Sequence, residues 1–198
     1  MIFFHIFVPT TSHNAMKYLS FFILLFIGEL SVSAQHMFSR QFPFFNQLSS
    51  NEIFSIHQDR EGYFWIGTTN GLARYDGYQL NTFRTDYKNQ NLLTDNGITA
   101  INDNDLYVWI GTWKGLNLYN KQTCRITPFS DARLLDKVVD AITVDKDGNV
   151  WVSAGGMIYR CDSTAHIIKE YEVGNIQEGY AISNIYVDQQ KQLWAVGS

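Results

Sequence analysis

The polarity of the chain alternates over short distances, as expected for short strands joined by tight turns. Apolar and polar residues alternate over residues 53–58, which is the period of a half-buried strand. Asp59-Arg60-Glu61-Gly62 is typical of a turn, because aspartate bonds to nearby backbone amides and glycine supplies a left-handed conformation. Asp76-Gly77 is a two-residue hairpin signal. The pattern predicts four antiparallel strands, at residues 53–58, 63–68, 72–75 and 79–83.

This unit recurs along the chain. Four antiparallel strands in about 40 to 45 residues are the composition of one β-propeller blade. We therefore predict an all-β protein made of β-propeller blades, each a four-stranded antiparallel repeat of about 43 residues. The later strands are predicted at residues 98–102, 107–112, 115–119 and 124–129, then at 139–144, 149–153, 157–160 and 167–171, and finally at 182–187 and 192–196.

A tryptophan marks each unit, and an aspartate stands six residues before it. Successive tryptophans are 44, 42 and 43 residues apart. Because each aspartate falls once per blade at a turn, we predict that it caps that turn and joins no catalytic or metal site. The indole rings are predicted to pack between blades. These structural repeat residues are Trp65, Trp109, Trp151 and Trp194, with Asp59, Asp103, Asp145 and Asp188.

The repeats divide the chain into blades and a lead-in. The blades are predicted at residues 51–84, 96–129, 138–171 and 180–198, and the last has half of its strands. Since propellers have about 4–8 blades, 3.5 blades form an incomplete ring, and we expect the chain to be the N-terminal fragment of a longer protein. Residues 35–50 form the lead-in. Within it, Met37–Phe45 is predicted to be a strand that could join the last blade and close the ring.

Residues 1–34 have the pattern of a secretory signal peptide. Met16 and Lys17 precede an apolar run at residues 21–27, and Val32-Ser33-Ala34 fits a cleavage site. The apolar run is shorter than the roughly 20 residues that a membrane helix needs. Met16 is the expected start, and the mature chain from Gln35 is expected outside the cytoplasm.

Charge and chemistry narrow the function classes. A formal net charge of −4 provides no attraction to nucleic acid or anionic lipid. Export permits a disulfide between Cys124 and Cys161, but their spacing leaves the pairing open. Histidines such as His57 and His166 lack metal-ligand spacing, and there is no nucleophile-and-base pattern. We therefore predict no catalytic residue, metal site or cofactor in this chain.

The repeat phrases resemble the two-component regulator propeller repeat. The resemblance rests on IHQDREGYFWIGTTNGLARYDG at residues 56–77 and WIGTWKGLNLY at residues 109–119. It extends over residues 38–198. The third repeat departs from it with Val152-Ser153-Ala154, and the fourth has Gln190-Lys191 where a turn glycine is expected.

The resemblance implies the N-terminal periplasmic sensor part of a hybrid two-component system of Bacteroidetes. The family's full-length proteins continue into a membrane helix, a histidine kinase and a receiver, and many sense oligosaccharides. By this resemblance the expected partners are an oligosaccharide, the remainder of the same polypeptide and, at full length, a second copy in a homodimer. The segment is expected in the periplasm, as part of an inner-membrane protein.

Trp113 and Lys114 are the candidate ligand-binding residues. Trp113 occupies the turn between the second and third strands of its blade, where the first blade has Thr69 and the third has Gly155. An indole beside a lysine can stack on a sugar ring, while ordinary surface packing or a contact with a partner protein is the alternative.

Two other function classes stay open. One is an exported propeller enzyme acting on glycans, a hydrolase or a lyase. Glycosidase chemistry requires a convergent acid and nucleophile, which the sequence does not identify. The other is an adhesion or scaffold propeller.

Overall fold

The computed structural model describes residues 42–85, 93–173 and 182–197, all within one structural unit. These residues form three antiparallel sheets of four strands and one of two strands. The first sheet contains β1 (Ile53–Gln58), β2 (Phe64–Thr68), β3 (Gly71–Tyr75) and β4 (Leu80–Phe83). The second contains β5 (Ile98–Asp103), β6 (Tyr107–Thr112), β7 (Gly115–Asn120) and β8 (Arg125–Pro128). The third contains β9 (Val139–Val144), β10 (Val150–Ala154), β11 (Met157–Cys161) and β12 (Ile167–Glu172), and the fourth contains β13 (Ile182–Val187) and β14 (Leu193–Gly197).

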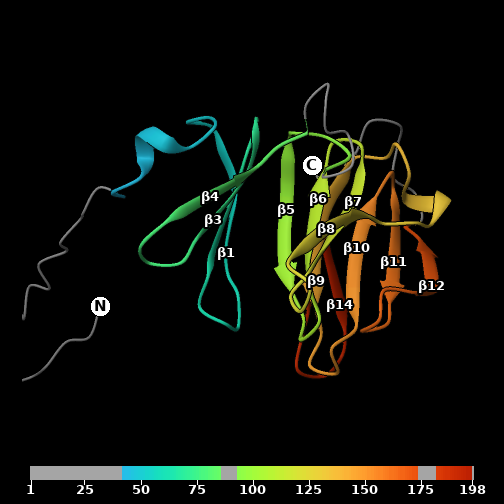
Figure 1. Ribbon diagram of the computed structural model, residues 1–198. Helices are drawn as coiled ribbons and strands as arrows, with labels where there is room; N and C mark the ends of the chain where they lie inside the picture. The colour runs from blue at the N-terminus through green and yellow to red at the C-terminus, as the bar shows by residue number, and fades with distance from the viewer. Residues whose placement is uncertain (1–41, 86–92, 174–181, 198) are drawn as a thin grey trace, which may run out of the picture. The chain divides into compact units, whose positions relative to one another are not determined.

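Each four-stranded sheet is a meander, with its strands hydrogen-bonded in chain order. The sheets follow one another along the chain (Figure 1). Their first strands are in contact: β1 with β5, β5 with β9, and β9 with β13. We call β1, β5, β9 and β13 the inner strands. This arrangement confirms the predicted all-β class with propeller blades, of which the fourth has two strands among the described residues.

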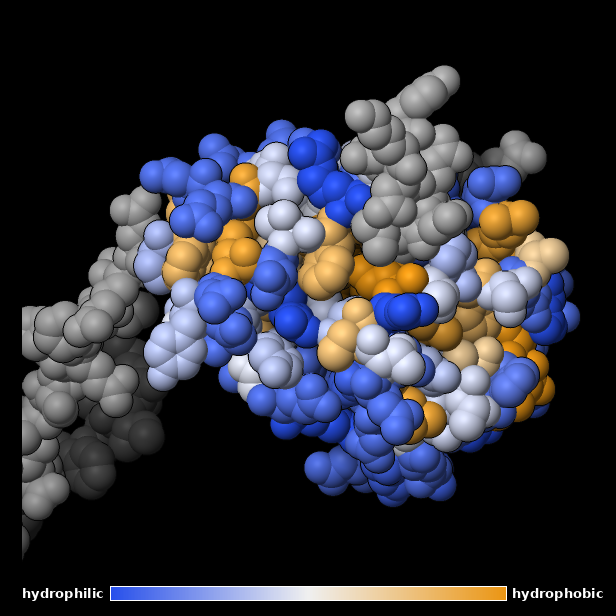
Figure 2. All heavy atoms as spheres, viewed as in Figure 1, coloured by the Kyte–Doolittle hydropathy of each residue, from blue (hydrophilic) through white to orange (hydrophobic). Residues whose placement is uncertain are grey.

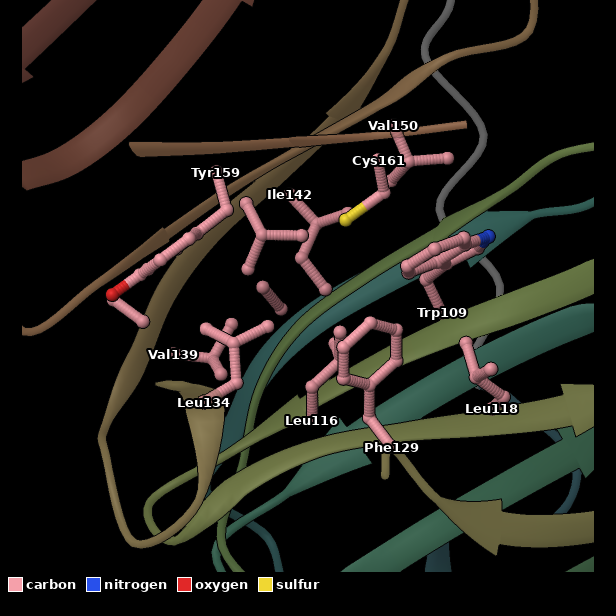
Figure 3. Close-up of a cluster of buried hydrophobic side chains, with 13 residues drawn as sticks. Trp109, Leu116, Leu118, Phe129, Leu134, Val139, Ile142, Val150, Tyr159 and Cys161 are labelled. Atoms are coloured by element: carbon pink, nitrogen blue, oxygen red, sulfur yellow. The ribbon is translucent and has the colours of Figure 1, made fainter. Parts of the chain in front are cut away.

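The core lies at the junctions between consecutive sheets. Each junction buries the indole ring of one sheet against aliphatic side chains on the inner strand of the next. Trp65 packs with Ile98 and Ile101, and Trp109 packs with Val139 and Ile142. Figure 3 shows the second of these clusters, where side chains of the second and third sheets meet. On the face seen in Figure 2, apolar residues instead lie as patches among polar ones.

The predicted packing of the tryptophans between blades holds for three of them. Trp65, Trp109 and Trp151 are buried, and Trp151 packs with Ile182 and Ile185 of the fourth sheet. Trp194 is 57% exposed, because no described residue covers that face of β13 and β14.

Two glycines allow the sheets to approach closely. A Cβ added at Gly67 would lie 2.6 Å from Cγ2 of Ile98, and one added at Gly111 would lie 2.6 Å from Cγ1 of Val139. Both glycines therefore face the inner strand of the next sheet, where no further atom fits. The third sheet has Ser153 at this position, fully buried.

The strict alternation predicted for residues 53–58 is wrong at Phe54. The pairing of β1 with β2 passes from Ile53 to Ser55, so Phe54 is the extra residue of a β-bulge. The bulge shifts the register by one, which places Ile53 and Ile56 on the same apolar face, although they are three residues apart.

The strand predicted over Met37–Phe45 is not formed by the part that the structure describes. Residues 37–41 lie outside the described residues, and η1, a 3-10 helix at Phe45–Gln47, begins at the other end. Pro43 lacks an amide proton for strand pairing and lies in a turn. The rings of Phe42 and Phe44 pack on Tyr75, with centroids 5.1 and 5.4 Å away.

This lead-in covers part of the free face of the first sheet. An apolar cavity of about 280 Å³ lies there, lined by Phe42, Phe45, Leu48, Ile53, Ile56, Phe64, Ile66 and Tyr75. The predicted signal peptide at residues 1–34 lies outside the described residues. The two 3-10 helices in the described ranges, η1 and η2 (Ala132–Leu134), are too short to cross a membrane.

The close approach of the sheets predicts opposite effects for two alanine substitutions. Gly111→Ala should lower the free energy of unfolding by about 1–3 kcal/mol, because the new methyl group collides with Val139. Ser153→Ala is the matched control. Since the buried Ser153 hydroxyl has no hydrogen-bond partner among the described residues, its removal should be neutral or stabilising by up to about 1 kcal/mol. Urea denaturation of the full chain measures both, and equal losses would contradict the prediction.

Candidate functional site

Three of the four repeated aspartates cap the turn between the first two strands of their sheet. Oδ1 of Asp59 accepts hydrogen bonds from the amides of Glu61 (3.0 Å) and Tyr63 (2.9 Å), and Oδ2 accepts one from Nε1 of Trp65 (2.7 Å). The carboxylate therefore ties the turn to the buried indole. The amides and the indole use both of its oxygens, in the structural role predicted.

Asp145 and Asp188 make the same contacts. Asp145 accepts from two turn amides and from Nε1 of Trp151 (3.1 Å). Asp188 accepts from two turn amides and from Nε1 of Trp194 (2.9 Å). In this last turn Lys191 takes the left-handed conformation, with φ of 63°, that Gly62 provides in the first sheet and Gly148 in the third.

The prediction is wrong for Asp103, because Asn104 caps the second turn instead. Oδ1 of Asn104 accepts from the amides of Leu106 (3.0 Å) and Tyr107 (2.9 Å). The turn is one residue shorter than in the first sheet, so counting back from the tryptophan leads to the wrong residue. Nε1 of Trp109 is buried without a partner among the described residues.

Asp103 instead connects the first two sheets through a buried charge cluster. Its carboxylate lies 2.7 Å from Nε2 of His57 on β1 and 2.6 Å from Nζ of Lys121, and it accepts from the amide of Arg60 (3.3 Å). Asp103 is 4% exposed and Lys121 is 6% exposed. Burial alone raises the Asp103 pKa, but the hydrogen bonds from His57 and Lys121 outweigh it and lower the pKa to about 2.

This cluster was missed by the sequence reasoning, because its members come from different repeats at unlike positions. It contains a carboxylate, an imidazole and an ammonium that bind one another. No group of three or more His, Cys, Asp or Glu side chains suited to a metal ion occurs in the part of the chain that the structure describes. The cluster therefore joins blades, and we assign it no catalytic step.

Trp113 and Lys114 lie in the turn between β6 and β7. The amide of Trp113 donates to the carbonyl of Gly97 (3.1 Å), and its ring occupies the space that a Cβ at Gly97 would need. The indole meets the ring of Phe54 edge to face at 6.3 Å and stays 43% exposed. Nζ of Lys114 lies 3.6 Å from Oδ2 of Asp95. The structure thus holds Trp113 on one side and leaves the rest of its ring open to solvent.

The other chemically reactive side chains considered in the sequence, His166 and the two cysteines, lie outside the turn that carries Trp113. His166 is exposed and contacts Asp162 and Thr164. Cys124 and Cys161 are both free, the first exposed and the second buried, so the open question of their pairing is resolved against a disulfide. Burial raises the pKa of the Cys161 thiol to about 12, which keeps it protonated at neutral pH.

The unequal indole contacts predict unequal costs of two matched substitutions. Trp65→Phe removes a hydrogen bond to a carboxylate as well as apolar area, whereas Trp109→Phe removes area alone. Trp65→Phe should therefore destabilise the protein by about 2 kcal/mol more than Trp109→Phe. Denaturant titration of both variants tests this, and a larger loss for Trp109→Phe would refute it.

The Asp103 cluster predicts a loss of stability in acid. Since the pKa is about 2 in the folded chain and about 4 when unfolded, the unfolded state binds more protons in between. The contribution of Asp103 to the free energy of unfolding, about 2 kcal/mol, is fully present above about pH 5 and is lost as the pH falls toward 2.

Two variants separate this effect from general acid denaturation. Asp103→Asn should cost about 3–5 kcal/mol at neutral pH, because Lys121 stays buried without its carboxylate, and should flatten the acid dependence. Asp105→Asn, at an 84% exposed carboxyl, should keep the parent profile. Thermal unfolding of the parent and both variants, measured from pH 7 to 2.5, tests this prediction. An unchanged dependence of stability on pH in Asp103→Asn would contradict it.

Comparison with known proteins identifies a propeller repeat in the first sheet. The two component regulator propeller family matches residues 47–70, which contain β1 and β2. A comparison with curated proteins returns no match.

Several solved structures share the fold. The extracellular domain of one hybrid two component system of B. thetaiotaomicron is 22% identical with a TM-score of 0.65, and the match covers 79% of this chain and 23% of that one. A second such domain from B. thetaiotaomicron is 21% identical with a TM-score of 0.58, over 76% and 21% of the two chains. Virginiamycin B lyase from Staphylococcus aureus is 18% identical with a TM-score of 0.57, over 73% and 48%.

The chain thus spans less than a quarter of the length of those two extracellular domains. At these identities the likeness establishes the fold alone. The family resemblance seen in the sequence is supported at its first repeat: residues 47–70 match the two component regulator propeller family, and the propeller fold is shared with extracellular domains of hybrid two component systems.

Proposed function

We propose that the chain is the N-terminal part of the extracytoplasmic sensor domain of a hybrid two-component signal-transduction protein. The observation that carries the proposal is the regulator propeller repeat at residues 47–70 on a fold shared with extracellular domains of such systems. The full-length protein would be a histidine kinase of the inner membrane, with this segment in the periplasm behind a signal peptide. Its partners would be the rest of the polypeptide and a second copy.

The ligand of the proposed sensor is an oligosaccharide, and Trp113 is its stacking platform. An aromatic face held by the protein before binding loses little conformational freedom when a sugar ring stacks on it. Trp113 meets this requirement, because Gly97 and Phe54 hold the ring while 43% of the side chain is exposed. Lys114 stands beside it as a hydrogen-bond donor for sugar hydroxyls.

An exported propeller enzyme acting on glycans is the competing proposal. Virginiamycin B lyase shares the fold with this chain, but at 18% identity that likeness carries no activity. A sensor returns its ligand unchanged, whereas a hydrolase or lyase does not. The fate of the bound sugar therefore separates the two proposals.

Calorimetry of the full chain against a panel of oligosaccharides tests the proposal. Trp113→Ala should weaken the binding of any ligand found by about tenfold or more, because a central aromatic contact is lost. The matched control is Tyr78→Ala, since Tyr78 is an aromatic residue at another turn and is 86% exposed. It should leave the affinity unchanged, and mass spectrometry should recover the ligand intact. Equal affinity of the parent and Trp113→Ala, or cleaved ligand, would count against the proposal.

A further inference from the structure

The inner strands share a structural irregularity that the repeated sequence pattern does not indicate. Each one carries a β-bulge at its second residue, where the pairing with the next strand skips one position. Bulges re-aim side chains and are frequent next to functional sites. The extra residues are Phe54, Thr99, Asp140 and Ser183, which we call the bulge row.

One member of the bulge row, Phe54, contacts Trp113, and the others lie on the neighbouring inner strands. The inner strands lie side by side in the order β1, β5, β9 and β13. Phe54 reaches the Trp113 ring of the next sheet. Thr99 follows Gly97, on which that ring rests, by two residues, and its hydroxyl donates to the carbonyl of Val139 at 2.5 Å. Asp140 directly follows Val139 in the chain, so its carboxyl group belongs to the inner strand one blade junction beyond Thr99.

The chemistry changes along the row. Phe54 and Trp113 form an exposed aromatic pair at one end. The hydroxyls of Thr99 and Ser183 donate to the main-chain carbonyls of Val139 and Val196, so the fold uses their protons. Asp140 differs from them, because its side chain has no hydrogen bond or ion pair with any of the described residues.

Asp140 is also partly withdrawn from water. It is half-buried, and this burial raises the pKa of its carboxyl. A carboxylate without a partner in such a place gains from a ligand that brings a positive charge and N–H donors. The other aspartates of the inner strands and their turns, such as Asp103 and Asp145, already have donors from the protein.

We propose that the bulge row and Trp113 form one ligand surface, on which the carboxylate of Asp140 selects an oligosaccharide carrying a free amino group. This rests on the proposed sensor function and adds the class of sugar. One ring stacks on Trp113, and the ammonium group of another ring donates to Asp140. Acetylation of the amine removes both the charge and two of its donors, so the acetylated sugar loses this contact.

Three oligosaccharides with the same β-1,4 linkage test the inference on the full chain. The probes are tetramers of glucosamine, N-acetylglucosamine and glucose, titrated by calorimetry at pH 6. The glucosamine tetramer should bind about tenfold tighter than the other two, the value of one charge-assisted contact. Asp140→Asn should remove this preference and leave the affinity for the glucose tetramer unchanged. Glu172→Gln removes the same charge on the exposed end of outer strand β12 and should preserve the preference.

The outcomes separate this inference from the proposed function. Equal binding of the three tetramers, or a preference that survives in Asp140→Asn, overturns the amine selection while the sensor proposal stands. A loss of affinity for all three tetramers in Asp140→Asn also overturns it, because the role of Asp140 would then be general. Absence of binding by any tetramer overturns the inference, while the wider panel with Trp113→Ala still decides on sugar sensing.

Discussion

The packing of two unlike sheet faces against each other is the interaction on which the rest of the structure depends. One face of each sheet presents a tryptophan, and the facing inner strand presents aliphatic residues three apart, such as Ile98 and Ile101. Because the faces differ, each junction joins the tryptophan face of one sheet to the aliphatic face of the next, which is a head-to-tail contact. Glycine at Gly67 and Gly111 keeps that contact close. Stability is therefore built junction by junction, as in other repeat proteins.

Much of this architecture could be predicted from the sequence, because the period of the tryptophans carries it. Hairpin signals such as Asp76-Gly77 located the strands almost to the residue, since turn chemistry is local. The bulges were hidden in the aliphatic spacing: Ile53 and Ile56, three apart in a strand, can share a face only if one extra residue lies between them. The secondary structure of the lead-in is harder to predict, because four phenylalanines in nine residues suit a strand and a packed turn equally well.

The candidate site was predicted in part, and the misses have a common cause. Trp113 was visible as an aromatic residue in a turn, but its neighbour Phe54 was not, since their contact crosses a blade junction. Asp103 was assigned to the wrong role because a turn shortened by one residue shifts the count from Trp109 back to the aspartate. Sequence periodicity describes what the repeats share. It does not describe contacts between residues that occupy different positions of the repeat in neighbouring blades. The Asp103 charge cluster and the pair of Phe54 and Trp113 are both contacts of this type.

The two ends of the array consequently differ in what they can bind. At the end with the first turn of each sheet, the carboxylates of Asp59, Asp145 and Asp188 are occupied by turn amides and indole nitrogens, and Asp103 is occupied by His57, Lys121 and Arg60. The bulges lie at the opposite end of the inner strands, next to the turn that carries Trp113. There the repeats vary from aromatic to hydroxyl to carboxylate, and Asp140 receives no hydrogen bond from any residue that the structure describes. A ligand can compete for a polar group only where the fold has not already used it, so the saturated end serves stability and the bulged end is where recognition can be added without loss of the fold.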